Sequence, residues 1–168
     1  NLVSLFISSR LQQQPIYEAL AVQDGIHLPK PEARLRHGQR QIIGVIRILT
    51  ESLPAELSVR EAWQQAQSSV FRSFIVVDSS GVIGVINRLR LERELAQDAN
   101  QQLGKIVSAL DFPHVHSDQS LDLALERMGA NQLDILPVVN RANVHKLEGI
   151  VTLRDVLDSY GVSPFDGA

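Results

Sequence analysis

The chain has 168 residues, of which 44% are hydrophobic and 21% are charged, a composition typical of globular proteins. Its formal net charge of −3 at pH 7 argues against a nucleic-acid partner, because nucleic-acid-binding domains normally present a basic face. The lack of cysteine excludes disulfides, thiolate nucleophiles and thiolate metal sites, and no apolar run approaches the roughly 18 residues that a membrane-spanning helix needs.

Residues 1–40 are predicted to form a linker that precedes the rest of the fold. Residues 2–11 are interpreted as the end of a helix that Pro15 breaks, and residues 16–22 as a second short helix closed by Gly25. Residues 30–40 carry four Lys and Arg side chains against one Glu, which is typical of an exposed tether. Because the first residues are apolar, we expect them to be buried against a part of the protein that precedes Asn1.

The rest of the sequence contains one pattern twice. Residues 58–62, 74–78 and 84–87 recur as residues 120–124, 136–140 and 149–152. The copies are 62 residues apart where the pattern starts and 65 apart where it ends, so one loop of the second copy holds three extra residues. A unit of this size is too small to bury its own apolar face, so the two copies are predicted to share a core.

Each copy is predicted to contain a strand, a helix, two strands and a helix. In the first copy, Ser58 and Glu61 form a capping box that starts the first helix. The apolar stripe expected on that helix consists of Val59, Ala62, Trp63, Ala66 and Val70. The other elements of the first copy are predicted at residues 50–53, 74–77, 82–86 and 88–96.

The elements of the second copy are predicted at residues 114–116, 121–128, 135–139, 149–151 and 153–160. The predicted fold class is α+β: two β-α-β-β-α units packed face to face about a pseudo-twofold axis. We place the units at residues 41–99 and 100–168, and expect the polar residues 97–104 between them to lie on the surface.

Little in the sequence supports an enzyme. The serines occupy helix starts and turns, where they are interpreted as caps. His114 and His116 share one face of a predicted strand, but no third ligand follows at a suitable spacing, so we predict an exposed strand edge rather than a metal site. Trp63 and Met128 occupy helical stripe positions and are interpreted as core residues.

Thr152 and Asp155 are better candidates for a binding site. Thr152 ends a predicted strand and Asp155 lies three residues further on, so one interpretation is a helix N-cap and nothing more. The other is a ligand site, because helix N-termini attract phosphate and a carboxylate can accept hydrogen bonds from both hydroxyls of a ribose. The two residues alone leave both interpretations open.

The duplicated pattern, over roughly residues 45–161, resembles a pair of cystathionine-β-synthase (CBS) domains, the tandem regulatory unit also called a Bateman module. Residues 15–20 (PIYEAL) and 23–29 (QDGIHLP) resemble the cytoplasmic linker of ClC-type chloride channels and transporters, where it follows the last membrane helix and precedes the first CBS domain.

The resemblance implies an adenine-nucleotide site in the cleft between the copies. Thr152 and Asp155 would hold phosphate and ribose, and the base pocket would be lined by Thr50, Phe71, Arg72 and Ser73. Phe71 is placed to stack on adenine, whereas Arg72 departs from the small polar residue expected and would either clash with the base or reach the phosphates. The mirror-related site has Asn87 and Arg90 instead of Thr and Asp, so we expect at most one occupied site.

The function implied is the regulatory domain of a ClC-type, voltage-gated chloride channel or chloride/proton exchanger, on the cytoplasmic side of a membrane. Its expected partners are a second copy of the chain and the membrane-embedded part of the same polypeptide. ATP, ADP or AMP is the expected regulatory ligand, and no cofactor is required. Two alternatives stay open: a CBS energy-sensing module of another protein, and a structural dimerisation domain without a ligand.

Overall fold

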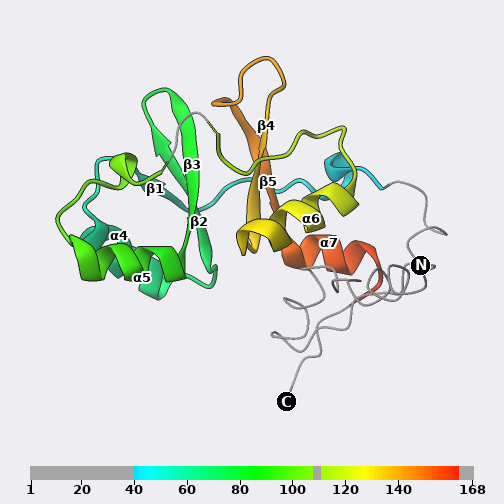
Figure 1. Ribbon diagram of the computed structural model, residues 1–168. Coiled ribbons are helices and arrows are strands. Elements are labelled where there is room, and N and C mark those ends of the chain that lie inside the picture. Colours follow the sequence, from blue (N-terminus) through cyan, green and yellow to red (C-terminus); the bar gives the residue numbers. More distant parts are fainter. Residues whose placement is uncertain (1–39, 108–110, 163–168) are drawn as a thin grey trace, which may run out of the picture.

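The computed structural model describes residues 40–107 and 111–162, drawn in colour in Figure 1. The predictions for residues 1–39 therefore lie outside the described residues. Within the described ranges, no helix is long and apolar enough to cross a membrane.

The first copy contains a three-stranded sheet in the order β1-β2-β3 (Figure 1). β1 pairs with β2 in parallel and β2 with β3 antiparallel. The element bounds are β1 Ser52–Pro54, α4 Val59–Ser68, β2 Ser73–Asp78, β3 Gly81–Asn87 and α5 Arg88–Gln97. β1 therefore begins two residues later than predicted. β2, β3 and α5 lie where the sequence places them.

The second copy repeats this plan in a sheet of two strands, β4 and β5, which pair antiparallel. Its element bounds are α6 Leu121–Asn131, β4 Ile135–Val139, β5 Leu147–Thr152 and α7 Leu153–Ser159. The strand predicted at residues 114–116 is wrong: only Val115 pairs, in a single parallel bridge to Val138. This bridge occupies the place that β1 has beside β2.

The two hairpins share an irregularity that confirms the internal repeat. The register of β2 and β3 shifts between Val76 and Val77, and that of β4 and β5 shifts between Val138 and Val139. A β-bulge at the same position of both copies bends and twists both hairpins alike. The mixed α+β fold of two similar units is as predicted.

The copies share a core, as their size requires. Successive side chains of a strand point to opposite faces of the sheet, and β2 is buried on both. Phe74 and Val76 pack in an apolar cluster with residues of α4 and α5, whereas Ile75 belongs to a second cluster formed mainly by residues of the second copy. Met128 is buried in that second cluster, as predicted, whereas Trp63 is half-buried and packs against the first cluster.

Each copy is completed by the segment that precedes the other copy. Ile42 donates its backbone N–H to Gln119 O at 2.9 Å, and Val59 donates to Gln101 O at 3.0 Å. Ile42 and Leu103 lie in two short 3-10 helices, Ile42–Val45 and Leu103–Lys105, and both side chains are fully buried. The cyan segment that holds Ile42 lies beside α6 and then crosses to the first copy (Figure 1).

The expectation that residues 97–104 lie on the surface holds for most of this segment but is wrong at Leu103. Leu103 is buried in the first copy's core, and its N–H bonds to Leu57 O at 2.8 Å. The assignment of residues 41–99 and 100–168 to separate units stays a prediction, and the packing described here crosses it in both directions.

Two glycines allow each copy to pack against the segment that precedes the other copy. A Cβ on Gly149 would lie 2.4 Å from Ile46 Cγ2 and 2.6 Å from Arg47 O, and one on Gly84 would lie 2.6 Å from Val107 Cβ. Such distances are too short for a real side chain. Each glycine therefore lets the segment that precedes the other copy lie directly against its hairpin.

The capping box at α4 is confirmed. Glu61 donates its backbone N–H to Ser58 Oγ at 3.3 Å, and the Glu61 carboxylate accepts the backbone N–H of Ser58 at 2.8 Å. Hydrogen bonds from the Ser58 hydroxyl and backbone hold the pKa of Glu61 below its usual value. The predicted stripe is wrong at Val70, because α4 ends at Ser68 and the Val70 side chain is 88% exposed.

Candidate functional site in the cleft between the copies

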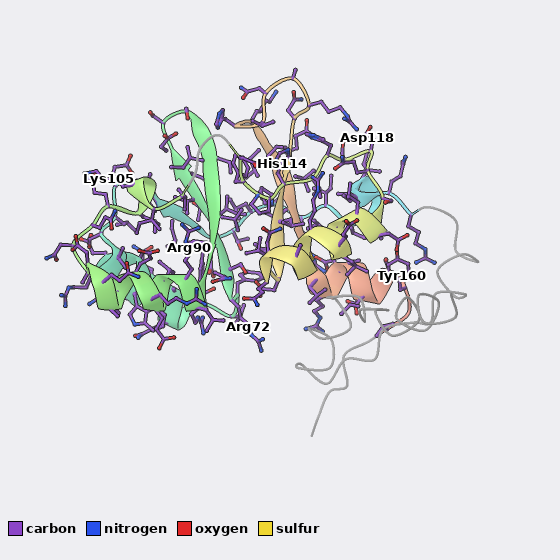
Figure 2. All side chains as sticks on the ribbon, viewed as in Figure 1. Arg72, Arg90, Lys105, His114, Asp118 and Tyr160 are labelled. Carbon is purple, nitrogen blue, oxygen red and sulfur yellow. The ribbon has the colours of Figure 1, made fainter. Side chains whose placement is uncertain are left out.

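A cavity of about 850 Å³ lies between the two copies. Its lining comes from residues 47, 48 and 50, from the segment before β2, from Asp134 before β4, from the end of β5 and from α7. Five of the six residues predicted for the nucleotide site line it: Thr50, Phe71, Arg72, Thr152 and Asp155. Arg72 lies at the end of the first sheet, where the two copies meet (Figure 2).

Ser73 is not among the lining residues. Its side chain is 1% exposed, and its Oγ accepts the backbone N–H of Asp134 at 3.2 Å. Ser73 therefore joins the two copies through this hydrogen bond, and its predicted place in the base pocket stays a prediction.

Thr152 and Asp155 form the helix cap that their spacing predicts. The Thr152 hydroxyl accepts the Asp155 backbone N–H at 3.1 Å and donates to Asp155 Oδ2 at 2.7 Å. Both residues are buried, Asp155 at 6% exposure, although both line the cavity. Asp155 therefore places a buried hydrogen-bond acceptor at the wall of the cavity.

Arg47 is a site residue that sequence reasoning missed. Its Nη2 forms an ion pair with Asp155 Oδ1, while its side chain remains 66% exposed. Its backbone is fixed by a pair of hydrogen bonds with Ile150, at 2.9 and 2.8 Å. No local motif marks Arg47, because its partner lies in the other copy.

Asp134 is the second missed residue, and it occupies the position in the second copy that Arg72 occupies in the first. Asp134 Oδ2 accepts the backbone N–H of Arg72 at 3.0 Å, and its backbone O accepts the N–H of Leu153 at 2.8 Å. Its Oδ1 is buried without a hydrogen-bond partner. Because the donor is a backbone N–H, which every residue except proline has, the residue type at position 72 gives no sign of this contact.

Arg88 supports the loop that carries Phe71. Its Nη2 donates to the carbonyl oxygens of Ala66 at 2.7 Å, Ser69 at 3.1 Å and Phe71 at 3.0 Å. Its backbone N–H donates to Arg72 O at 2.7 Å. The start of α5 therefore fixes the loop on the first copy's side of the cavity.

The mirror-related position has a different arrangement. Asn87 caps α5 as predicted, since its Oδ1 accepts the Arg90 N–H at 2.8 Å, and its amide also donates to Gln132 O at 3.3 Å. The Arg90 guanidinium donates to Ile106 O at 2.6 Å. In Figure 2, Arg90 lies well within the first copy, away from Arg72. Asn87 and Arg90 thus replace the hydroxyl and carboxylate that line the cavity on the other side.

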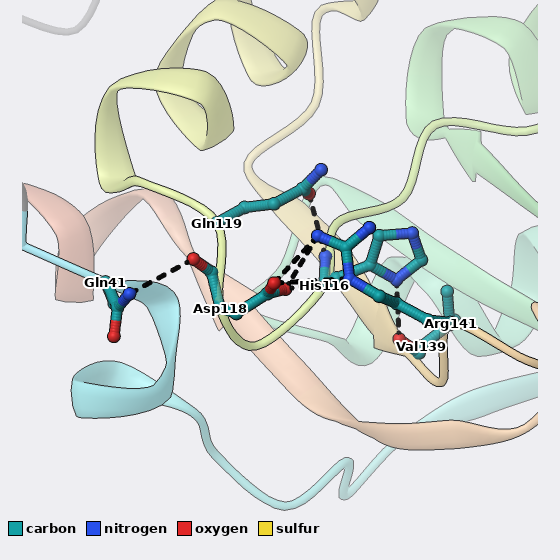
Figure 3. Close-up of polar contacts among 6 residues, drawn as sticks. All are labelled: Gln41, His116, Asp118, Gln119, Val139 and Arg141. Carbon is teal, nitrogen blue, oxygen red and sulfur yellow. Dashed lines mark hydrogen bonds and ion pairs between the residues drawn. The ribbon is translucent and has the colours of Figure 1, made fainter.

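The histidines contribute to packing between chain segments. His114 and His116 are half-buried rather than exposed, which corrects the prediction for this edge, and their ring centroids are 5.2 Å apart. His116 Nδ1 bonds to Val139 O beside the Asp118–Arg141 ion pair (Figure 3). Hydrogen bonds from Arg141 hold the pKa of Asp118 below its usual value. Within the described ranges, no group of three or more potential ligands could hold a metal ion.

Comparisons with known proteins agree with the repeat. Residues 105–161 match the sequence model of the CBS domain family. A search of curated proteins found no match.

Three solved structures show the likeness in fold. A CBS domain pair/ACT domain protein from Thermotoga maritima has a TM-score of 0.58 and 25% identity, over 71% of this chain and 95% of that one. The cytosolic domain of the Mg²⁺ channel MgtE, in complex with ATP, has a TM-score of 0.55 and 22% identity, over 76% and 51%. The CBS domain pair of protein MJ0100, in complex with 5′-methylthioadenosine and S-adenosyl-L-methionine, has a TM-score of 0.56 and 19% identity, over 73% and 96%. The second copy thus carries the CBS-domain pattern, and the chain has the fold of a CBS domain pair.

Proposed function

We propose that this chain is a regulatory module that binds an adenine nucleotide in the cleft between its two copies and has no catalytic role. The observation that carries the proposal is the cavity itself, in which side chains of both copies meet around the buried carboxylate of Asp155. Its volume of about 850 Å³ lies within the roughly 300–1,000 Å³ of typical small-molecule sites.

The lining suits the three parts of a nucleotide. Asp155 offers an acceptor for ribose hydroxyls, and the Arg47, Arg72 and Arg154 side chains supply positive charge for phosphates. Phe71 adds an aromatic ring, and base stacking on such a ring contributes about 1–3 kcal/mol. The structures of MgtE with ATP and of MJ0100 with adenosine derivatives support the choice of ligand by analogy of fold.

Calorimetry with ATP, ADP and AMP tests this proposal. We expect binding to the unaltered chain and a loss of affinity of about tenfold or more in Asp155→Ala, because a charged hydrogen-bond acceptor is removed. Glu126→Ala is the control, since Glu126 is an exposed carboxylate of α6 that does not line the cavity. Absence of heat with every nucleotide at millimolar concentration would overturn the proposal, provided that thermal unfolding shows a folded chain.

We propose further that the module belongs to a ClC-type chloride channel or exchanger and lies on the cytoplasmic side of its membrane. The support is the sequence resemblance of residues 15–20 and 23–29, which lie outside the described residues. The module would act as a homodimer on the membrane part of its own polypeptide. A nucleotide would bias that part only by its difference in affinity between two arrangements of the copies.

The coding sequence before Asn1 provides a direct check of this membrane context. About ten or more apolar helices there would support it. A soluble enzyme or an unrelated domain in that place would instead favour an energy-sensing module of another protein.

One observation favours a different function, a dimerisation domain without a ligand. Asp155 already has a partner for each carboxylate oxygen, Thr152 for Oδ2 and Arg47 for Oδ1. A cleft whose key acceptor is satisfied within the chain does not need a ligand for stability. This alternative would be established if the chain sediments as a stable dimer and calorimetry detects no binding heat with any of the nucleotides.

A further inference from the structure

Arg47 holds the one oxygen of Asp155 that the helix cap does not use. Asp155 Oδ2 accepts the Thr152 hydroxyl, whereas Oδ1 is paired with the Arg47 guanidinium. A ligand hydroxyl that approaches this buried carboxylate therefore competes with Arg47 for Oδ1. A hydrogen bond between two charged groups is stronger than one from a neutral hydroxyl, so a hydroxyl alone is a weak competitor.

The side chain of Arg47 is free to change partners although its backbone is not. Two hydrogen bonds to Ile150 and the close approach to Gly149 fix the Arg47 backbone against β5. The side chain is 66% exposed and lines the cavity. Its guanidinium can therefore turn from Asp155 to another acceptor in the cavity without any change of fold.

The effect of releasing Arg47 depends on what the ligand brings. A nucleoside takes Asp155 Oδ1 with its hydroxyls and gives the displaced guanidinium no anionic partner. A nucleotide takes the same oxygen and also supplies phosphate oxygens, which guanidinium groups bind with well-matched geometry. The exchange replaces one ion pair by another only when the ligand carries phosphate.

We propose, on the basis of the nucleotide site proposed above, that Arg47 selects phosphorylated ligands by exchanging Asp155 for a phosphate. Arg47 opposes the binding of adenosine and favours the binding of ATP. Arg154 also lines the cavity, but its guanidinium pairs with Asp158, with Nε 3.9 Å from Asp158 Oδ2. Arg154 adds positive charge to the cavity but does not occupy the Asp155 carboxylate.

Titration calorimetry of the purified chain with ATP and with adenosine tests the exchange. In Arg47→Gln we expect ATP to bind about tenfold more weakly, through loss of one charged pair, and adenosine to bind more tightly, because Asp155 is no longer held. Arg154→Gln should weaken ATP without improving adenosine. Arg93→Gln, a change at an exposed arginine of α5 outside the cavity, should alter neither affinity.

Two further measurements distinguish a failure of the role proposed for Arg47 from a failure of the proposed nucleotide site. Arg47→Lys, which keeps the charge, should restore part of the preference for ATP, and thermal unfolding should confirm that each variant is folded. Equal changes of both affinities in Arg47→Gln, or no change in either, would overturn the role of Arg47 while the nucleotide site stands. Failure of both ligands to bind the unaltered chain and every variant would overturn the nucleotide site, and the exchange with it.

Discussion

The two carboxylate oxygens of Asp155 have different partners: Oδ2 accepts the Thr152 hydroxyl at the helix cap, and Oδ1 pairs with Arg47. The cap could be predicted from sequence, because Thr152 and Asp155 lie three residues apart and N-cap geometry is local. The ion pair with Arg47 could not, because it depends on how the chain crosses from the second copy to the first. Contacts within one turn of helix can thus be read from spacing, whereas those that shape the site require the tertiary structure.

Ile42 provides a stability prediction at the residue scale. Its side chain is fully buried in the second copy's core, whereas the neighbouring Ile43 is 65% exposed. We expect Ile42→Ala to lower the free energy of unfolding by about 3 kcal/mol, through lost burial and the cavity left behind. Ile43→Ala should change it little. Urea denaturation of the two variants checks this, and equal costs would contradict the packing described for residues 40–47.

Among the elements, those buried on both faces agree best with prediction. β4 matches its predicted bounds because its continuous apolar run is typical of a buried strand. The pairing at Val115 cannot extend toward the N-terminus, since Pro113 and Pro137 both lack the N–H groups that the next parallel rung needs. Toward the C-terminus, the carbonyl oxygen of Val139, which the next rung would use, is bonded to the His116 ring instead. Prolines and a side-chain bond thus end a strand that residue pattern alone predicts.

The junction between β5 and residues 46–47 gives a prediction at the element scale. Gly149→Ala places a methyl group 2.6 Å from the backbone oxygen of Arg47, which cannot move without breaking its bonds to Ile150. We expect a loss of about 1–3 kcal/mol, typical of overpacking. Gly44→Ala is the matched control, since a Cβ there meets no atom within 4 Å. A thermal unfolding midpoint lowered equally in both variants, or in neither, would contradict this account of the junction.

At the scale of the whole molecule, the repeat determines both the shared core and the position of the cleft. The internal similarity predicts two alike units, and the matching bulges in their hairpins confirm that likeness. It does not predict which copy Ile42 or Leu103 completes, because the two segments occupy equivalent places in the repeat. The resemblance to CBS domain pairs implies one intact side and one altered side of the cleft, from the residue types at Thr152, Asp155, Asn87 and Arg90. The detailed lining depends on Arg47 and Asp134, each of which contacts the other copy.

The most direct test of the nucleotide cleft is a titration of the ¹⁵N-labelled chain with ATP, followed by amide NMR spectra. We predict shift changes at lining residues of both copies, at Phe71 on one side and at Thr152 and Asp155 on the other. The amides of Asn87 and Arg90, at the mirror-related position, should stay nearly unchanged. Spectra unaffected by millimolar ATP, or changes confined to the mirror-related position, would contradict the account.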